Sequence, residues 1–110
     1  MLISHCSRFL YVFMEAVRFA DYCGTKYCVG VGNGLDSLKL SLNGGLGIGE
    51  GNEVIVPSNT YIATALAVSY VGALPVFVDP DIRTYNIDST KIEEKITGRT
   101  KAIMTVHLYG

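Results

Sequence analysis

Charged residues are scarce in this sequence, and neither sign dominates. Lysine and arginine contribute 9 residues, aspartate and glutamate contribute 10, and the formal net charge is -1. Because there is no basic excess, nucleic acid and acidic membrane surfaces are not expected as partners. Only 17% of the residues are charged, whereas globular domains average about 25%. A chain of 110 residues that is also 49% hydrophobic indicates the core of a larger protein or of an obligate oligomer.

Cysteine is rare as well, and its spacing matches no known cysteine motif. Cys6, Cys23 and Cys28 are odd in number and form no CxxC pair. This pattern is typical of reduced intracellular thiols and not of a disulfide framework or a zinc site. The sequence therefore predicts a cytoplasmic protein.

The N-terminal stretch lacks an apolar run long enough to span a bilayer, because Arg8 and Glu15 interrupt it. It also fits a signal peptide poorly, since such a peptide needs cations ahead of its apolar stretch and a small-residue cleavage site. Its apolar residues recur instead at helical spacing, at Phe9, Val12, Phe13, Ala16, Val17 and Ala20. An amphipathic helix is the resulting prediction.

Strands and helices are predicted to alternate along the rest of the chain. Four apolar runs predict strands, at residues 26–31, 53–57, 74–79 and 101–110. Helical patterns lie between them, at residues 35–42, 61–72 and 89–96, and the glycine-rich residues 43–52 are expected to end the first of these helices. The strands are continuously apolar, which is typical of parallel strands covered on both faces. We therefore predict an α/β fold, as part of a three-layer α/β/α sandwich with a mostly parallel sheet.

The stretch "GVGNGLDSL", residues 30–38, lies between the first predicted strand and its helix. Free amides at a helix N-terminus favour a phosphate by about 0.3–2 kcal/mol, and Gly34 would allow a close approach. The stretch fails as a dinucleotide fingerprint, because Leu35 stands where the third glycine should be, and it is not a P-loop. The residues alone leave two interpretations open: a phosphate site, or a glycine turn before a capped helix.

From about Phe19 to Gly110 the sequence resembles the N-terminal part of the large domain in the DegT/DnrJ/StrS sugar aminotransferases, which are pyridoxal-phosphate enzymes of the aspartate-aminotransferase fold. Four segments carry this resemblance, in order and in spacing: "YCGTKYCVGVGNGLDSL", "GIGEGNEVIVPSNTYIATALAVSYVGALPVFVD", "TYNIDSTKIEEKI" and "TKAIMTVHLYG". Residues 1–18 do not resemble the usual N-terminus of the family. They are treated as an atypical N-terminal helix, and residues 19–110 as a truncated part of the large domain.

The resemblance implies a role for four residues. The amides of Leu35 and Asp36, reached through Gly34, would hold the phosphate of the pyridoxal 5'-phosphate, and Tyr61 would stack on its pyridine ring. Leu35 replaces the usual threonine, as in the branch of the family that acts on 3-keto nucleotide-linked deoxyhexoses. His107 and Tyr109 end a predicted strand at the same edge of the sheet, which makes His107 a further candidate for lining the site.

The family's Schiff-base lysine and the acid beside the pyridine nitrogen are expected beyond Gly110. None of the chain's five lysines matches the lysine motif. The resemblance implies that the complete protein would be a homodimer and would transfer an amino group, from glutamate, to a nucleotide-linked keto sugar. The chain alone is expected to be inactive. Two hypotheses stand: a piece of a sugar aminotransferase, or a non-catalytic module that keeps the phosphate cradle or only the fold.

Overall fold

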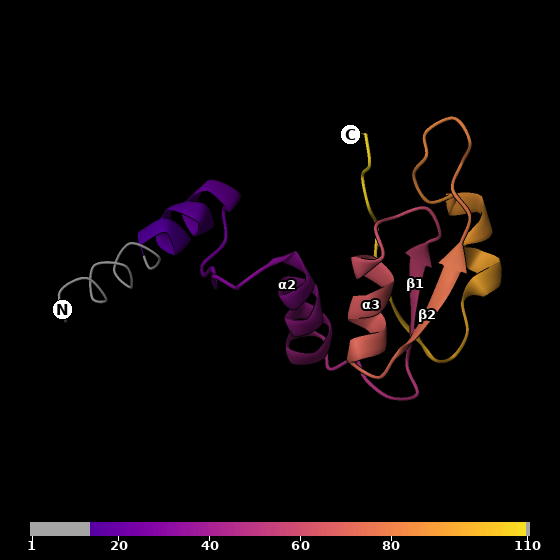
Figure 1. Cartoon of the computed structure of the whole chain (residues 1–110), viewed down its shortest axis with the longest axis horizontal. Helices are drawn as coiled ribbons and strands as arrows, with labels where there is room; N and C mark the ends of the chain where they lie inside the picture. Colours follow the sequence, from indigo (N-terminus) through magenta and orange to yellow (C-terminus); the bar gives the residue numbers. More distant parts are fainter. Residues whose placement is uncertain (1–13, 110) are drawn as a thin grey trace. The chain divides into compact units, whose positions relative to one another are not determined.

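A computed structural model describes residues 14–109 (Figure 1). The chain divides into two compact units, one ending at Gly32 and the other beginning at Asn33. Among the described residues, no helix has the length and apolar character needed to cross a membrane.

In the described part of the first unit, residues 14–23 form a helix. The predicted N-terminal helix is thus confirmed for that part, while Phe9, Val12 and Phe13 lie outside the described residues. The strand predicted for residues 26–31 is wrong, because these residues form no ladder. Tyr27 and Val29 are exposed. A strand requires a partner for its backbone groups, and none of the three described strands pairs with this segment.

The second unit is built on a three-stranded parallel sheet in the order β2-β1-β3. The strands are β1 (Glu53–Pro57), β2 (Leu74–Val78) and β3 (Thr100–Ile103). All five residues of the central strand β1 are buried, as its continuous apolar run predicts. The α/β class and the parallel sheet are therefore confirmed. The fourth predicted strand is shorter than expected, since β3 ends at Ile103.

Two helices pack together beside the sheet: α2 (Gly34–Leu40) and α3 (Ala63–Tyr70). After α2 the chain continues as the π-helical segment η1 (Ser41–Gly45), so the expectation that glycines end the helix at residue 43 is wrong. The wider helix is closed by the amides of Leu46, Gly47 and Ile48, which donate to the carbonyls of residues 41–43. Gly72 ends the α3 region with φ +82°, the left-handed conformation that glycine adopts readily.

The core lies between these helices and one face of the sheet. Its buried residues are Leu42, Ile48, Val54, Val56, Ala67, Val68 and Ala73. Leu35 and Leu38 pack against it from α2, so the predicted apolar face of that helix, completed by Leu42, is confirmed. This packing holds the N-terminus of α2 near the start of α3, and both ends contribute to the site described below.

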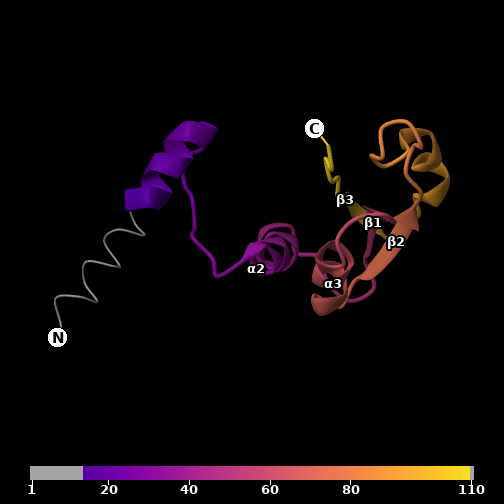
Figure 2. The ribbon, with the colours of Figure 1, turned by 45° about the horizontal axis from the view of Figure 1, so that its top comes forward.

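The connection from β2 to β3 covers the opposite side of the sheet from α3 (Figure 2). It contains two short 3₁₀ turns, η2 (Ser89–Lys91) and η3 (Glu93–Lys95), in place of the single helix predicted. The predicted cap is confirmed, because the Asp88 side chain accepts a hydrogen bond from the Thr90 amide. The helix does not continue because Ile96 is extended, with ψ 128°, on the way to β3.

The start of β3 is fastened to β1 by a buried carboxylate. Glu53, 3% exposed, pairs with Nη2 of Arg99 at 2.5 Å and accepts a hydrogen bond from the Thr97 hydroxyl. The Glu53 amide also donates to the Arg99 carbonyl at 2.9 Å. These contacts fix the approach of β3 at the point where its register against β1 shifts.

Candidate functional site

A cleft of about 820 Å³ opens between the N-terminus of α2 and the start of α3. Three of the four predicted site residues, Gly34, Leu35 and Tyr61, line it. The remaining lining residues are Asn33, Ser37, Leu38, Ile62, Ala63, Thr64 and Leu66. None of these side chains is charged, so an anion in the cleft would be held by backbone amides and neutral polar groups and not by a cation from this set.

Asn33 begins α2, and it was not among the predicted site residues. Its Oδ1 accepts a hydrogen bond from the Asp36 amide at 2.9 Å, and its Nδ2 donates to Oδ2 of Asp36 at 3.0 Å. The sequence does contain a signal for this cap, because asparagine is among the preferred residues before the first helical turn. The amide of Asp36 is therefore already engaged, and a phosphate that used it would have to displace the Asn33 side chain.

The side chain of Asp36 does not line the cleft. Its carboxylate also lies 3.8 Å from the ammonium group of Lys39. Asp36 thus belongs to the cap of the helix and to an exposed ion pair. Of the two amides expected to hold phosphate, only that of Leu35 lies in a cleft-lining residue and is not held by the cap.

Gly34 leaves open space at the mouth of α2. A Cβ built there would meet no heavy atom within 4 Å, and its φ is not in the left-handed region. The fold therefore does not require glycine at this position. What glycine provides is free access to the first amides of the helix.

Tyr61 stands just before α3 with its side chain 80% exposed. Ile62, the residue that caps α3, makes no side-chain hydrogen bond to the helix, while Thr64 in the first turn is buried. Tyr61 is therefore accessible to a ligand in the cleft, and an aromatic ring of this kind can stack on a flat aromatic group.

His107 and Tyr109 do not line this cleft. His107 is exposed, and the ring of Tyr109 meets that of Tyr85 edge to face at 5.8 Å. The expectation that His107 lines the site is therefore not confirmed for this cleft. No lysine lines it either.

The loop between β2 and η2 carries two carboxyl groups whose pKa values are lowered, those of Asp81 and Asp88. A hydrogen bond from the Arg83 side chain lowers the pKa of Asp81, and the same pair raises the pKa of Arg83. The pKa of Asp88 is lowered chiefly by the hydroxyl of Thr90. None of these groups lines the cleft, so they act on the loop.

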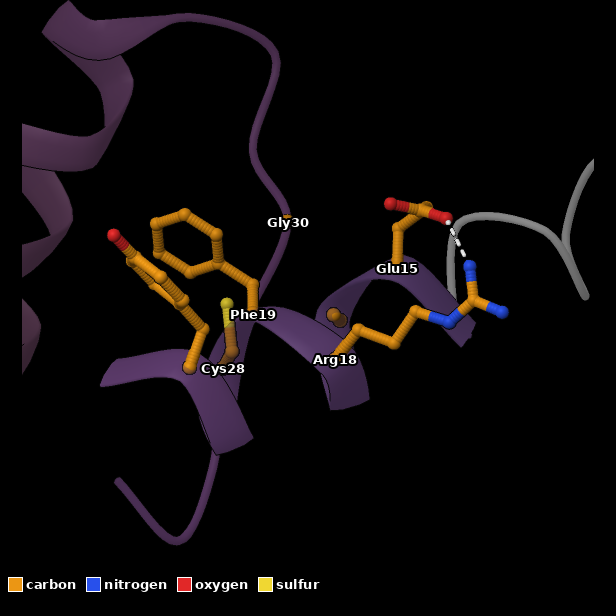
Figure 3. A pocket seen from close by; sticks show the side chains of 7 residues that line it. Glu15, Arg18, Phe19, Cys28 and Gly30 are labelled. Carbon is orange, nitrogen blue, oxygen red and sulfur yellow. Dashed lines mark hydrogen bonds and ion pairs between the residues drawn. The ribbon is translucent and has the colours of Figure 1, made fainter. Parts of the chain in front are cut away.

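A second hollow, of about 550 Å³, lies in the first unit (Figure 3). Phe19 and Cys28 line it, and Glu15 and Arg18 pair along its helix at 3.3 Å. The rings of Phe19 and Tyr22 lie 6.5 Å apart. Its lining is mainly apolar, and the one ion pair shown in it joins two neighbours on the same helix. The cleft beside α2 is the stronger candidate, because it brings together three of the predicted site residues and this hollow contains none of them.

Comparisons with known proteins identify the family of the chain. A family model described as the DegT/DnrJ/EryC1/StrS aminotransferase family matches residues 13–110. A dTDP-3-amino-3,6-dideoxy-alpha-D-galactopyranose transaminase of Aneurinibacillus thermoaerophilus is 69% identical over 93 residues, which are 84% of this chain and 25% of that protein. The chain thus spans about a quarter of the length of this relative.

Solved structures show the same relationship. DesV of S. venezuelae, in complex with a ketimine intermediate, superposes with a TM-score of 0.85 at 52% identity, over 90% of this chain and 26% of that one. A GDP-4-keto-6-deoxymannose-3-dehydratase with a trapped PLP–glutamate geminal diamine superposes with a TM-score of 0.82 at 35% identity, over 91% and 27%. The first of these structures holds a ketimine intermediate and the second a PLP–glutamate adduct. Together with the family match over nearly the whole chain, they show that the chain belongs to the DegT/DnrJ/EryC1/StrS aminotransferase family.

Proposed function

We propose that this chain supplies the phosphate cradle and the ring platform for pyridoxal 5'-phosphate in a sugar aminotransferase. The observation that carries the proposal is that the N-terminus of α2 and the ring of Tyr61 share one open cleft. The first offers free amides and the positive end of a helix, which suit an anion. The second offers an aromatic face, which suits a pyridine ring.

The residues present fit the two ends of the cofactor. Gly34 leaves open space for a phosphate, and Leu35, which lines the cleft, would contribute its amide. The amide of Asp36 would join them once the Asn33 cap gives way. Bound pyridoxal phosphate would supply the electron sink for amino-group transfer, and the residues described here would hold and orient it.

The amine that bonds to the cofactor is not provided by the described lysines. Lys39 pairs with Asp36, Lys91 pairs with Asp88 at 3.6 Å, and Lys26 lies over the ring of Tyr27. Lys95 and Lys101 are exposed and line no part of the cleft. We therefore propose that this chain by itself does not catalyse transamination.

We further propose that the complete protein transfers an amino group from glutamate to a nucleotide-linked keto-deoxy sugar at its 3-position and functions as a homodimer. The name of the Aneurinibacillus relative, which specifies a 3-amino sugar, supports the ring position. The glutamate adduct in the dehydratase supports the donor. Leu35 lines the cleft and is the residue we assign to contact with the sugar.

An alternative is a non-catalytic phosphate-binding module on the same fold. The absence of a lysine among the residues lining the cleft does not distinguish the two, because the lysine of a sugar aminotransferase is expected beyond Gly110. Both functions require the same phosphate-binding residues. They differ only in whether transamination occurs when the rest of the domain is supplied.

The test is a graft, called here the grafted transaminase: the Aneurinibacillus relative with its matching 93 residues replaced by those of this chain. We expect it to bind pyridoxal phosphate stoichiometrically and to transaminate a dTDP-linked 3-keto sugar with glutamate. The unmodified relative is the positive control. Folding with cofactor binding but without turnover would favour the non-catalytic module, and folding without cofactor binding would refute the cradle.

The isolated chain tests the expected inactivity. After incubation with pyridoxal phosphate and borohydride, mass mapping should find no lysine modified stoichiometrically. A single stoichiometric pyridoxyl-lysine would contradict the proposal, because it would identify an amine in this chain that the cofactor selects.

A further inference from the structure

The position of the Tyr61 ring depends on the backbone that precedes it. The Tyr61 hydroxyl has no hydrogen-bond partner among residues 14–109, and its side chain is mostly exposed. The Tyr61 carbonyl accepts hydrogen bonds from the Thr64 amide at 3.1 Å and from the Thr60 hydroxyl at 2.9 Å. Whatever orients the turn between β1 and α3 therefore orients the ring.

Three hydrogen bonds tie that turn to the last residue of β2 and to the loop that follows it. The Ser58 amide donates to the Val78 carbonyl at 2.9 Å, and the Ser58 hydroxyl donates to Oδ1 of Asp79 at 3.3 Å. Nδ2 of Asn59 donates to the carbonyl of Tyr85 at 2.9 Å. The Asn59 bond is the one nearest to Tyr61, and it spans 26 residues of sequence.

The acceptor of that bond is held in an unusual conformation. Tyr85 has φ 58° and is the one non-glycine residue with positive φ among the described residues. Its amide donates to the Asp81 carbonyl at 2.8 Å, the Asp81 amide donates to the Asn86 carbonyl at 2.9 Å, and its ring packs against Tyr109. Strained backbone of this kind persists only where surrounding contacts determine it, and it clusters at functional sites.

We infer that Asn59 is a positioning residue, which sets the Tyr61 ring over the cleft by anchoring the turn to the carbonyl of Tyr85. The inference rests on the proposed function, since it assigns Asn59 to the cofactor ring platform. Asparagine suits this task because its side-chain amide can donate a hydrogen bond to a backbone carbonyl. The strained Tyr85 fixes where that carbonyl points.

The experiment compares three Asn59 variants, to Asp, Ala and Gln, with a control in the grafted transaminase. Asn59→Asp keeps the size of the side chain but replaces the donor with an acceptor, and Asn59→Ala removes the group. Asp88→Ala is the matched control, because it removes a side-chain to amide bond from the adjoining loop without touching the turn. Measurements are the dissociation constant of the cofactor, its induced circular dichroism in the visible band, and the unfolding of the apo form.

We expect Asn59→Ala to raise the cofactor dissociation constant about fivefold to tenfold, the effect of losing one net hydrogen bond, and to change the induced dichroism. Asn59→Asp should have the larger effect, and Asn59→Gln, which retains a donor, should restore part of the binding. Asp88→Ala should weaken the apo form while leaving the dichroism unchanged.

Two results would overturn the inference separately. If the unmodified graft folds but binds no cofactor, the proposed function fails, and the assignment of Asn59 fails with it. If the graft binds cofactor and the Asn59 variants lose only as much stability as Asp88→Ala, with unchanged dichroism and affinity, Asn59 merely supports the loop and the inference alone is wrong.

Discussion

Replacing Gly34 by alanine separates a phosphate cradle from a structural turn. The new methyl group would enter open space, because no heavy atom lies within 4 Å of its position. The backbone there is not left-handed, so alanine adds no strain. The fold should therefore tolerate the change, while a phosphate at the first amides of α2 should meet the methyl group.

Gly34→Ala should raise the stability of the apo protein but lower its affinity for the cofactor. Glycine within a helix is less favourable than alanine by about 0.5–1 kcal/mol, so the apo protein should become slightly more stable. The interaction of an anion with a helix N-terminus contributes about 0.3–2 kcal/mol. Losing it entirely would raise the cofactor dissociation constant about twofold to thirtyfold.

The grafted transaminase provides the assay, with absorbance titration for cofactor binding and urea unfolding for the apo form. Gly44→Ala is the matched control, because Gly44 lies in the same helical run, faces equally open space and does not line the cleft. It should stabilise the apo form to a similar degree and leave the dissociation constant unchanged. A Gly34→Ala protein that is destabilised, or that binds cofactor as tightly as before, would refute the reasoning.

Three further outcomes are expected in the same protein. Leu35→Thr should leave the cofactor dissociation constant within about twofold, because the residue acts on phosphate through its backbone amide; titration checks this, and a larger change would assign the side chain to the cofactor. Arg99→Met should lower the free energy of unfolding by about 2–3 kcal/mol, because it leaves the buried Glu53 carboxylate without its cation. Glu53→Gln should lower it by about 1 kcal/mol, because the mostly exposed Arg99 side chain then interacts with water. Equal losses of the two variants in urea unfolding would contradict this order. The lowered pKa of Asp88 means that its contribution to stability is present above the usual carboxyl pKa of about 4 and is lost as the pH falls through the lowered value. Thr90→Val should move that loss to higher pH, and an unchanged carboxyl titration by NMR would exclude the hydroxyl as its cause.

The parallel sheet was predictable because its strands are short, apolar and bounded by recognisable stops. Pro57 ends β1 and Gly72 closes the α3 region, each through its own backbone chemistry. The segment at residues 26–31 has the same apolar composition but forms no strand. The composition of a segment indicates its propensity to form a strand. Whether the strand forms also depends on a pairing strand that lies elsewhere in the chain.

The site was predictable only in part. The glycine pattern and the resemblance indicated Gly34, Leu35 and Tyr61, and the structure brings these three residues to one cleft. The competition between Asn33 and a ligand for the Asp36 amide depends on a side-chain rotamer, which sequence spacing does not specify. The Asn59 to Tyr85 bond depends on a strained φ and spans 26 residues, so no local pattern indicates it.

With the strand order β2-β1-β3, the crossover from β1 to β2 and the crossover from β2 to β3 pass on opposite sides of the sheet (Figure 1). The chain turns through α3 on one side of the sheet to reach β2, then passes back across β1 by way of η2 and η3 on the other (Figure 1). β1 and β3 therefore meet at a topological switch point, where the loops after neighbouring strands diverge and open α/β sheets receive their ligands. The turn carrying Asn59 follows one of these strands, and residues 104–109 follow the other. A ligand that extends from the cleft along this edge would pass from the first set of residues to the second, so contacts to the far end of a long substrate should be sought after β3.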